Sequence, residues 1–207
     1  MANVLYGPEE LNTRVTGAAR AVFLEKGLEK AEMNEIAARA GVSRSTLYRF
    51  AEDKERLAFM VASEIVTTIS QRALVSQTAG TGFEKLAACI ETKIAAYSQD
   101  LPTLRFLCEF DRRYSGATPN RDYAQDYEQQ MQKLAAKSTQ LLFEGVADGS
   151  IRCMENPMLF IAVLNETVMA LLTREFVRDD DYLKQNFERN LGIIREAARI
   201  LLASVKA

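Results

Sequence analysis

The sequence of 207 residues contains no histidine. Histidine is the commonest zinc ligand in proteins and the usual proton acceptor beside a catalytic serine, so its absence excludes most zinc sites and most catalytic dyads and triads. Ser43 and Ser45, for example, have no histidine to activate them. We therefore expect no catalytic residue, no metal and no cofactor.

The sequence also lacks paired cysteines and long apolar runs. Its cysteines, Cys89, Cys108 and Cys153, lie far apart and without metal-ligand spacing. Such a set is typical of reduced thiols, which we expect to be buried. No run approaches the eighteen apolar residues of a membrane-spanning helix, and Met1–Val4 does not open a signal peptide. We expect a soluble, cytoplasmic protein that does not enter a membrane.

Residues that interrupt helices are scarce, with 10 glycines and 4 prolines. Helices can therefore run long, and this favours an all-α fold. The net charge of −2 hides a local asymmetry, because Ala37–Phe50 contains Arg39, Arg44 and Arg49 but no acid. A basic patch on a mildly acidic protein is typical of local phosphate binding.

This patch lies in a stretch, Gly27–Leu57, with the pattern of two short helices. Ile36, Ala37 and Ala40 recur at helical spacing, and Gly41 can end their helix in the left-handed conformation. Ser43 can cap the next helix, which Leu47 and Phe50 would bury. A helix, a tight turn and a second helix with a cationic face predict a helix-turn-helix, whose second helix enters the major groove of DNA. The alternative is a plain helical hairpin.

The stretch resembles the DNA-binding domain of the TetR family of repressors, roughly over Val15–Val61. The resemblance rests on four motifs at fixed separations, Gly27-Leu28, Ile36-Ala37-x-x-Ala40-Gly41-Val42-Ser43, Thr46-Leu47-Tyr48-Arg49 and Lys54-Glu55-x-Leu57. Two positions depart from the family pattern. Ala31-Glu32 replaces Thr-Thr before the second helix, and Phe50-Ala51 replaces the usual pair of aromatic rings.

The resemblance, together with the polar face of the second helix, predicts the residues that contact DNA. They are Arg44, Ser45, Thr46, Tyr48, Arg49 and, at the start of the next helix, Lys54. We expect arginine to bind guanine, and Tyr48 and Lys54 to bind phosphates. For Lys54 the alternative is an ordinary surface lysine.

The resemblance implies an N-terminal three-helix helix-turn-helix domain and a larger helical C-terminal domain, about nine helices in all. We place the DNA-binding domain at residues 1–52 and the effector-binding and dimerisation domain at residues 53–207. A connecting helix is expected over residues 53–77, before the break at Gly80 and Gly82. The further helices are expected at about 83–97, 103–114, 123–147, 156–177 and 182–205.

The C-terminal domain is expected to bind a small-molecule effector, weakly indicated to be hydrophobic or aromatic. Candidate lining residues are the aromatic and sulfur-containing residues of the middle helices, with one amide to orient the ligand: Tyr97, Phe106, Phe110, Tyr127, Met131, Met169 and Asn165. Apolar pockets with a few polar groups are typical of such sites. Ordinary core packing is the alternative for each residue taken singly.

The last two helices are expected to form a homodimer. Residues 182–205 carry one apolar face for the core and a second one, Ile193, Ala197 and Ile200, for a partner chain. Paired helices of this kind would form a four-helix bundle, and a two-fold dimer would bind a pseudo-palindromic operator in double-stranded DNA. A thick monomeric core is the alternative.

Three classes of function remain open. The first is a dimeric regulator, by the family resemblance a repressor, that a small molecule releases from its operator. The second is a DNA-binding protein of the same fold that senses no effector, and the third is an all-α enzyme. DNA binding distinguishes the first two from the third, and a roomy ligand cavity distinguishes the first from the second.

Overall fold

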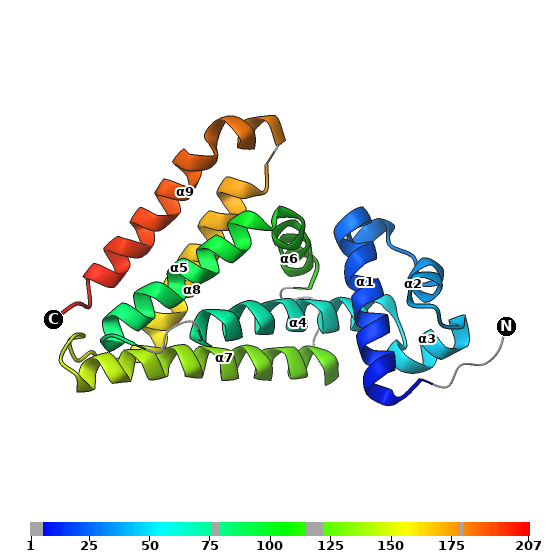
Figure 1. Cartoon of the computed structure of the whole chain (residues 1–207), viewed down its shortest axis with the longest axis horizontal. Coiled ribbons are helices and arrows are strands. Elements are labelled where there is room, and N and C mark those ends of the chain that lie inside the picture. The colour runs from blue at the N-terminus through cyan, green and yellow to red at the C-terminus, as the bar shows by residue number, and fades with distance from the viewer. Residues whose placement is uncertain (1–5, 76–78, 115–121, 179) are drawn as a thin grey trace. The chain divides into compact units, whose positions relative to one another are not determined.

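The computed structural model describes four stretches of the chain, residues 6–75, 79–114, 122–178 and 180–207 (Figure 1). These residues form nine α-helices and one isolated antiparallel bridge between Ile151 and Lys206. The all-α fold expected from the sequence is confirmed. The expected end of the connecting helix at residue 77 lies outside the described residues.

Backbone contacts divide the chain into two compact units. Unit 1 contains Met1–Ile65 and Phe106–Tyr127, and unit 2 contains Val66–Arg105 and Glu128–Ala207. Three helices contribute to both units: α4 (Lys54–Val75), α6 (Leu101–Tyr114) and α7 (Asp122–Ala147). This division is made on compactness and differs from the boundary expected at residues 52 and 53, which stays a prediction about function.

Unit 1 begins with α1 (Pro8–Lys30), α2 (Met33–Ala40) and α3 (Arg44–Ala51). The apolar side of α1 packs against α2, and α2 packs against α3. The first helix extends past its expected end near Lys26 and kinks at Gly27, where φ is +78°. Glycine reaches this conformation without the steric cost that a Cβ imposes.

Aromatic residues from four helices, α1, α4, α6 and α7, pack together in unit 1. Phe59 of α4 lies with its ring centroid 4.9–5.8 Å from those of Phe110, Tyr114, Tyr123 and Tyr127. Phe106 of α6 stacks on Phe23 of α1, with the centroids 5.7 Å apart. This aromatic cluster explains why parts of α4, α6 and α7 belong to the same compact unit as the helix-turn-helix.

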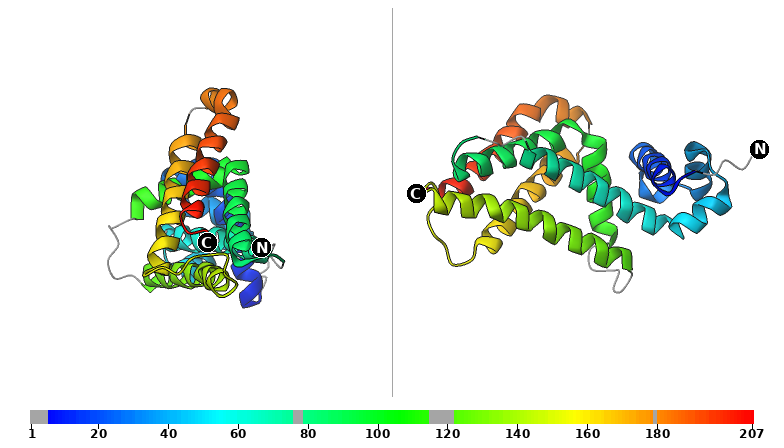
Figure 2. Two further views of the ribbon diagram at one scale, coloured as in Figure 1. Left: turned by 90° about the vertical axis from the view of Figure 1, so that its left-hand side faces the viewer. Right: turned by 60° about the horizontal axis from the view of Figure 1, so that its bottom comes forward.

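Unit 2 is built around α5 (Gly82–Gln99), α8 (Pro157–Phe176) and α9 (Asp180–Ala203). The last two form an antiparallel pair, and α5 packs against both of them (Figures 1 and 2). A capping box starts α5, because the Thr81 hydroxyl accepts from the Glu84 N–H while the Glu84 carboxylate accepts from the Thr81 N–H.

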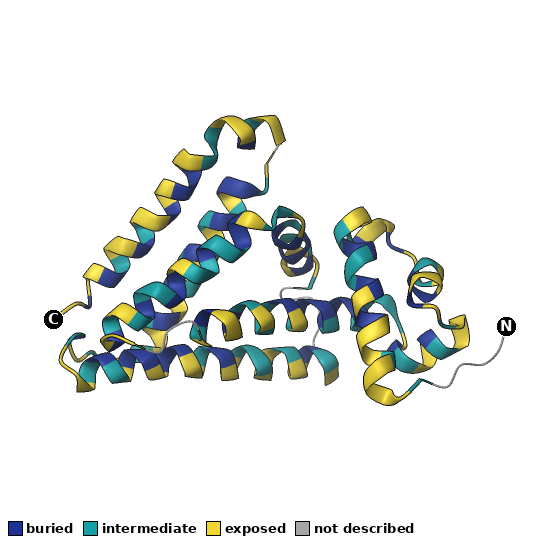
Figure 3. Cartoon of the chain, in the orientation of Figure 1, coloured by how far each residue is buried: buried dark blue, intermediate teal, exposed yellow. Residues whose placement is uncertain are grey.

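Both α8 and α9 combine a buried face with an exposed apolar one (Figure 3). Leu164, Leu172 and Ile194 are fully buried, whereas five large apolar residues are exposed: Met158, Leu159, Val163, Ile193 and Ile200. Within the described stretches, α8 alone is long and apolar enough to cross a membrane, which is weak evidence because core helices of soluble proteins pass the same test.

The cysteines differ in exposure. Cys89 is buried, Cys108 is half-buried and Cys153 is exposed, and all three are free thiols. Burial raises the pKa of the Cys89 thiol. The expectation of buried thiols therefore holds for Cys89 and is wrong for Cys153, which lies in the connection between α7 and α8, away from any helix face.

Candidate nucleic-acid interface

The turn between α2 and α3 fixes how α3 is presented. Gly41 ends α2 at φ +69°, and its N–H donates to the carbonyl of Ala38. Ser43 then caps α3, because its hydroxyl accepts from the Thr46 N–H at 3.1 Å. Leu47 is fully buried and fixes the inner face of α3. Both signals expected from the sequence, the glycine turn and the serine cap, are present in the structure.

The outer face of α3 carries the predicted contact residues. Arg44, Ser45, Tyr48 and Arg49 are exposed, and Thr46 is half-buried. The guanidinium of Arg44 lies 5.4 Å from the centre of the Tyr48 ring, one turn further along the helix. This cation–π contact orients the arginine but leaves its N–H groups available to a base or phosphate.

Three hydroxyls converge at the start of α3. The Ser43 Oγ lies 2.9 Å from the Ser45 Oγ and 2.8 Å from the Thr46 Oγ1. A hydroxyl can both donate and accept, so these three side chains can donate to phosphate oxygens while some of the hydrogen bonds among them remain. The start of a helix also carries partial positive charge, which favours an anion there.

The arginines of the basic patch are not equivalent. Arg39 of α2 pairs with Glu25 at 2.8 Å, and this hydrogen bond lowers the pKa of the Glu25 carboxyl. Arg44 and Arg49 make no ion pair with any residue that the structure describes. The uncompensated positive charge of the patch is therefore concentrated on α3.

Lys54 has a different environment from the one expected of a phosphate ligand. Its ammonium group donates to the carbonyls of Leu28, Glu29 and Ala31, at 2.7, 3.1 and 3.0 Å. An ammonium has three N–H donors, so all of them are used within unit 1. Burial is the main cause that lowers the pKa of Lys54. In this structure Lys54 ties the start of α4 to the end of α1, and its contact with phosphate stays untested.

Glu109 of α6 binds the same corner of the chain, which we define as residues 28–31 after the kink at Gly27. Its carboxylate accepts from the N–H groups of Leu28 and Glu29, at 2.9 and 3.2 Å. The kink at Gly27 frees these N–H groups from the regular helical pattern. A Cβ on Gly27 would lie 3.0 Å from the Glu109 carboxylate, so glycine also permits the close approach. Nothing in the local sequence pattern indicated this residue.

Tyr6, another residue that the sequence did not single out, lies against the turn of the helix-turn-helix. Its hydroxyl donates to the carbonyl of Gly41 at 3.4 Å, and the guanidinium of Arg14 lies 4.5 Å from the centre of its ring. Arg14 also pairs with Glu10 at 3.1 Å. The residue that precedes α1 therefore helps to fix the turn that sets the direction of α3.

The predicted effector residues fall into both units. Phe106, Phe110 and Tyr127 belong to the aromatic cluster of unit 1, whereas Tyr97, Met131, Asn165 and Met169 belong to unit 2. In unit 2 a groove of about 620 Å³ lies between α5 and α9. Its lining mixes apolar residues such as Ile94 and Leu202 with the ion pair of Arg195 and Glu91, and it includes none of the seven predicted residues.

One predicted effector residue has a polar partner in unit 2. The side-chain oxygen of Asn165 on α8 accepts from the ammonium group of Lys93 on α5, at 3.2 Å. The amide nitrogen of Asn165 donates to the carbonyl of Ile161 at 2.9 Å. Lys93 was missed because a single lysine in an amphipathic helix gives no signal of its own.

The family model of "Bacterial regulatory proteins, tetR family" matches residues 15–61. Three solved structures illustrate the similarity of the whole chain. The transcriptional regulator FadR from Bacillus subtilis, in complex with stearoyl-CoA, is 18% identical with a TM-score of 0.69, over 93% of this chain and 98% of that chain. SmeT, the repressor of the Stenotrophomonas maltophilia multidrug efflux pump SmeDEF, is 17% identical with a TM-score of 0.65, over 95% and 90%.

The third is RolR in complex with resorcinol, which is 19% identical with a TM-score of 0.66, over 95% of this chain and 88% of that chain. A comparison with curated proteins found no match. At these identities the likeness to solved structures concerns the fold, and the family model covers the helix-turn-helix itself. Residues 15–61 therefore form a DNA-binding domain of the TetR family, and the whole chain shares the fold of solved regulators of that family.

Proposed function

We propose that this chain is a homodimeric repressor, which binds a pseudo-palindromic operator and releases it when a small molecule binds to unit 2. The observation that carries the proposal is the outer face of α3, where Arg44 and Arg49 are exposed and make no ion pair with a described residue. Such cations can neutralise phosphates without first breaking an ion pair, and the counterions that DNA then releases favour binding.

Within this proposal the residues of α3 have different tasks. Arg44 at the start of the helix is placed to bind the two acceptors of a guanine, while Tyr48 and the hydroxyls of Ser45 and Thr46 hold phosphates and set the register. Arg49, in the last turn, adds a backbone or base contact. Lys54 contributes to DNA binding indirectly. Because its ammonium group donates to three carbonyls at the end of α1, it fixes the position of α4.

The exposed apolar face of α8 and α9 supports a dimer. Ile193 and Ile200 are 36% and 56% exposed in the single chain, and Ala197 lies between them on the same side of α9. Met158, Leu159 and Val163 expose a similar surface on α8. Exposed apolar residues on two adjacent helices favour burial against a second copy, in a four-helix bundle with two-fold symmetry.

Effector binding in unit 2 is supported by what similar proteins bind. FadR was solved with stearoyl-CoA and RolR with resorcinol, so two regulators of this fold bind organic small molecules. These ligands differ from each other, and neither is assigned to this chain. Of the residues expected to contact the effector, Asn165 has the most specific environment, because its side-chain oxygen accepts from the ammonium group of Lys93.

Selection of bound duplexes from a random DNA pool tests the DNA-binding part of the proposal. We expect a pseudo-palindromic consensus with half-sites about one helical turn apart. Arg44→Ala should lose the preference for one base pair in each half-site, at ~1–3 kcal/mol of discrimination. Arg72→Ala, an exposed arginine in the last turn of α4, is the matched control and should select the parent's consensus.

Two results would contradict the assignment. If Arg44→Ala and Arg49→Ala both selected the parent's consensus with the parent's affinity, α3 would not contact the bases. If the parent bound the consensus but no small molecule ever weakened that binding, the chain would be a DNA-binding protein of this family without effector sensing.

A further inference from the structure

Lys93 is an ionisable residue in an apolar part of unit 2. It lies on α5, one turn after Cys89 and one turn before Tyr97, both of which are buried. Neighbouring residues on the same helix, Ile90 and Ile94, are buried as well. Lys93 itself is half-buried, so part of its side chain keeps exposed surface.

No carboxylate within the described residues pairs with Lys93. Its polar contact is the side-chain oxygen of Asn165, at 3.2 Å, and the thiol of Cys89 is the ionisable group that interacts electrostatically with it. Burial lowers the pKa of the Lys93 ammonium. A desolvated cation held by one neutral amide is unfavourable for stability, because neither a counter-charge nor water compensates it fully.

The N–H donors of Lys93 and Asn165 outnumber the acceptors that the described residues offer them. An ammonium has three N–H donors, and Asn165 accepts one of them. The Asn165 amide has two N–H donors, and the Ile161 carbonyl accepts one of those. Two ammonium donors and one amide donor therefore have no acceptor among the described residues, and all of them lie at the same contact between α5 and α8.

We propose that Lys93 and Asn165 bind the carboxylate of an effector whose remaining part is apolar. This inference rests on the proposed function, in which unit 2 binds the effector, and it names the chemical class. The three remaining donors match the oxygens of one carboxylate, and the surrounding apolar residues of α5 and α8 match an apolar remainder.

A carboxylate fits better than a phosphate. One ammonium offers a single positive charge, which a carboxylate neutralises, whereas a phosphate would leave excess negative charge in apolar surroundings. Arginine is the residue best suited to bidentate phosphate binding, and within the described part of the chain no arginine forms a hydrogen bond with Lys93 or Asn165. An alcohol would satisfy a donor but would leave the ammonium without a counter-charge.

Two pairs of probes, which differ only in the head group, test the proposal: decanoate with decan-1-ol, and benzoate with benzyl alcohol. Affinities are measured by isothermal titration calorimetry on the full-length protein. For at least one pair we expect the carboxylate to bind at least about tenfold tighter than the alcohol, as a charged hydrogen bond warrants. In Lys93→Met this preference should disappear, although the alcohol should bind as to the parent.

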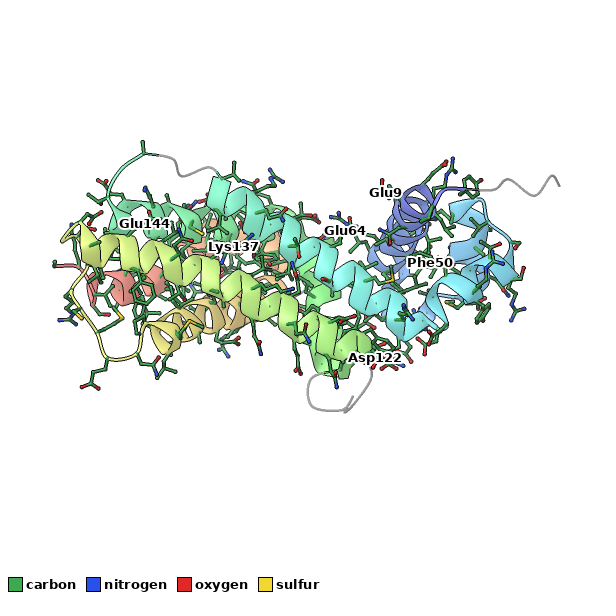
Figure 4. All side chains as sticks on the ribbon, turned by 90° about the horizontal axis from the view of Figure 1, so that it is seen from below. Glu9, Phe50, Glu64, Asp122, Lys137 and Glu144 are labelled. Carbon is green, nitrogen blue, oxygen red and sulfur yellow. The ribbon has the colours of Figure 1, made fainter. Side chains whose placement is uncertain are left out.

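Lys137→Met is the matched control, because Lys137 is an exposed lysine of α7 (Figure 4), and it should keep the preference. Lys93→Gln removes the charge but can still donate to Asn165, so it tests the charge if Lys93→Met does not fold. Lys93→Met should also raise the melting temperature of the ligand-free protein, since it removes a desolvated cation.

Three results would overturn the proposal: equal binding of acid and alcohol in both pairs, a preference that survives both Lys93 variants, or no binding of either carboxylate up to about 1 mM. Operator binding is measured separately and distinguishes the two levels of inference. Carboxylates that bind through Lys93 without releasing DNA would leave this site intact and contradict the proposed release. An uncharged compound that releases DNA would support the proposed release and contradict the carboxylate class of the effector.

Discussion

Gly82 and Gly145 allow the start of α5 to touch the end of α7. A Cβ on Gly82 would lie 2.0 Å from the backbone nitrogen of Gly145, and a Cβ on Gly145 would lie 2.5 Å from the side chain of Ile151. Neither position has a positive φ, so the requirement for glycine comes from space and not from backbone conformation. The contact at Gly82 concerns backbone atoms, which cannot move aside as a side chain can.

We predict that Gly82→Ala lowers the free energy of unfolding by ~3 kcal/mol, because the added methyl group forces two backbone segments apart. Urea denaturation followed by circular dichroism measures the change. Gly17→Ala in α1 is the control: a Cβ there meets nothing within 4 Å, and the variant should gain ~0.4–1 kcal/mol. A Gly82→Ala protein as stable as the parent would mean that the two helices do not touch.

Residues that act locally could be predicted from the sequence, and residues that act at long range could not. The Gly41 turn and the Ser43 cap depend on neighbours within three or four positions, so their pattern in the sequence was sufficient. Lys54 and Glu109 each meet the corner after Gly27 from a distance of more than twenty residues. Only the folded chain could reveal that Lys54 donates to three carbonyls.

At the scale of helices, an aspartate outside α5 stabilises the start of that helix. Asp148 follows α7, and its carboxylate accepts from the N–H groups of Gly82 and Ser150 at 2.7 and 2.9 Å. Hydrogen bonds from Ser150, and next from Gly82, lower the pKa of Asp148, and hydrogen bonds from Thr81 lower the pKa of Glu84. Both acids thus favour the ionised form in the folded protein.

These lowered pKa values predict a loss of stability in acid. A carboxyl whose pKa is lower in the folded state stabilises the protein above its unfolded pKa and loses that contribution as the pH falls through its folded pKa. We expect Asp148→Asn to be less stable than the parent at pH 7, and the gap to narrow below about pH 4. Thermal unfolding from pH 7 to pH 3 measures it.

Asp126→Asn, at an exposed position of α7, provides the control for loss of one negative charge, and its difference from the parent should stay small throughout. A gap between parent and Asp148→Asn that stayed constant from pH 7 to pH 3 would contradict the role of the ionised carboxylate at the start of α5.

The first and last residues of each helix in this chain follow from local signals. Whether an apolar helix face lies in the core or lines a pocket does not follow from such signals. The expected helix ends lie within a few residues of the observed ones, because caps, glycines and apolar spacing act locally. The same apolar spacing describes a core residue and a pocket residue equally well. Phe106, Phe110 and Tyr127 were expected to contact an effector, and they pack with Phe23 and Phe59 in unit 1.

At the scale of the whole molecule, the apolar surface of α8 and α9 carries the prediction of a dimer. Ile200→Asp would place a charge without a partner in the proposed interface, so we expect the protein to become monomeric at micromolar concentration. Analytical ultracentrifugation measures the change. Gln132→Asp introduces the same charge at an exposed position of α7 and should leave the dimer intact. A monomeric parent would contradict the proposed assembly.

Coupling between effector and operator is the last prediction, and it follows from the helices that the two units share. α4 begins in unit 1, where Lys54 is bound to the end of α1, and continues into unit 2. In the reverse direction, α6 begins in unit 2 and reaches unit 1, where Glu109 accepts from Leu28 and Glu29. A ligand that shifts α4 or α6 therefore acts on the corner that supports the helix-turn-helix, provided that it binds the two conformations with different affinity.

Thermodynamic linkage makes this coupling measurable from either side. A preference of ~1–3 kcal/mol for the conformer that does not bind DNA would weaken operator binding ~5–150-fold, and operator would weaken effector binding by the same factor. We expect this reciprocity when an effector, found by thermal-shift screening, is titrated into the protein with and without its selected operator. Glu109→Gln should reduce the factor, because it weakens the connection between α6 and the corner after Gly27. Equal effector affinities in the two titrations would mean that unit 2 serves dimerisation alone.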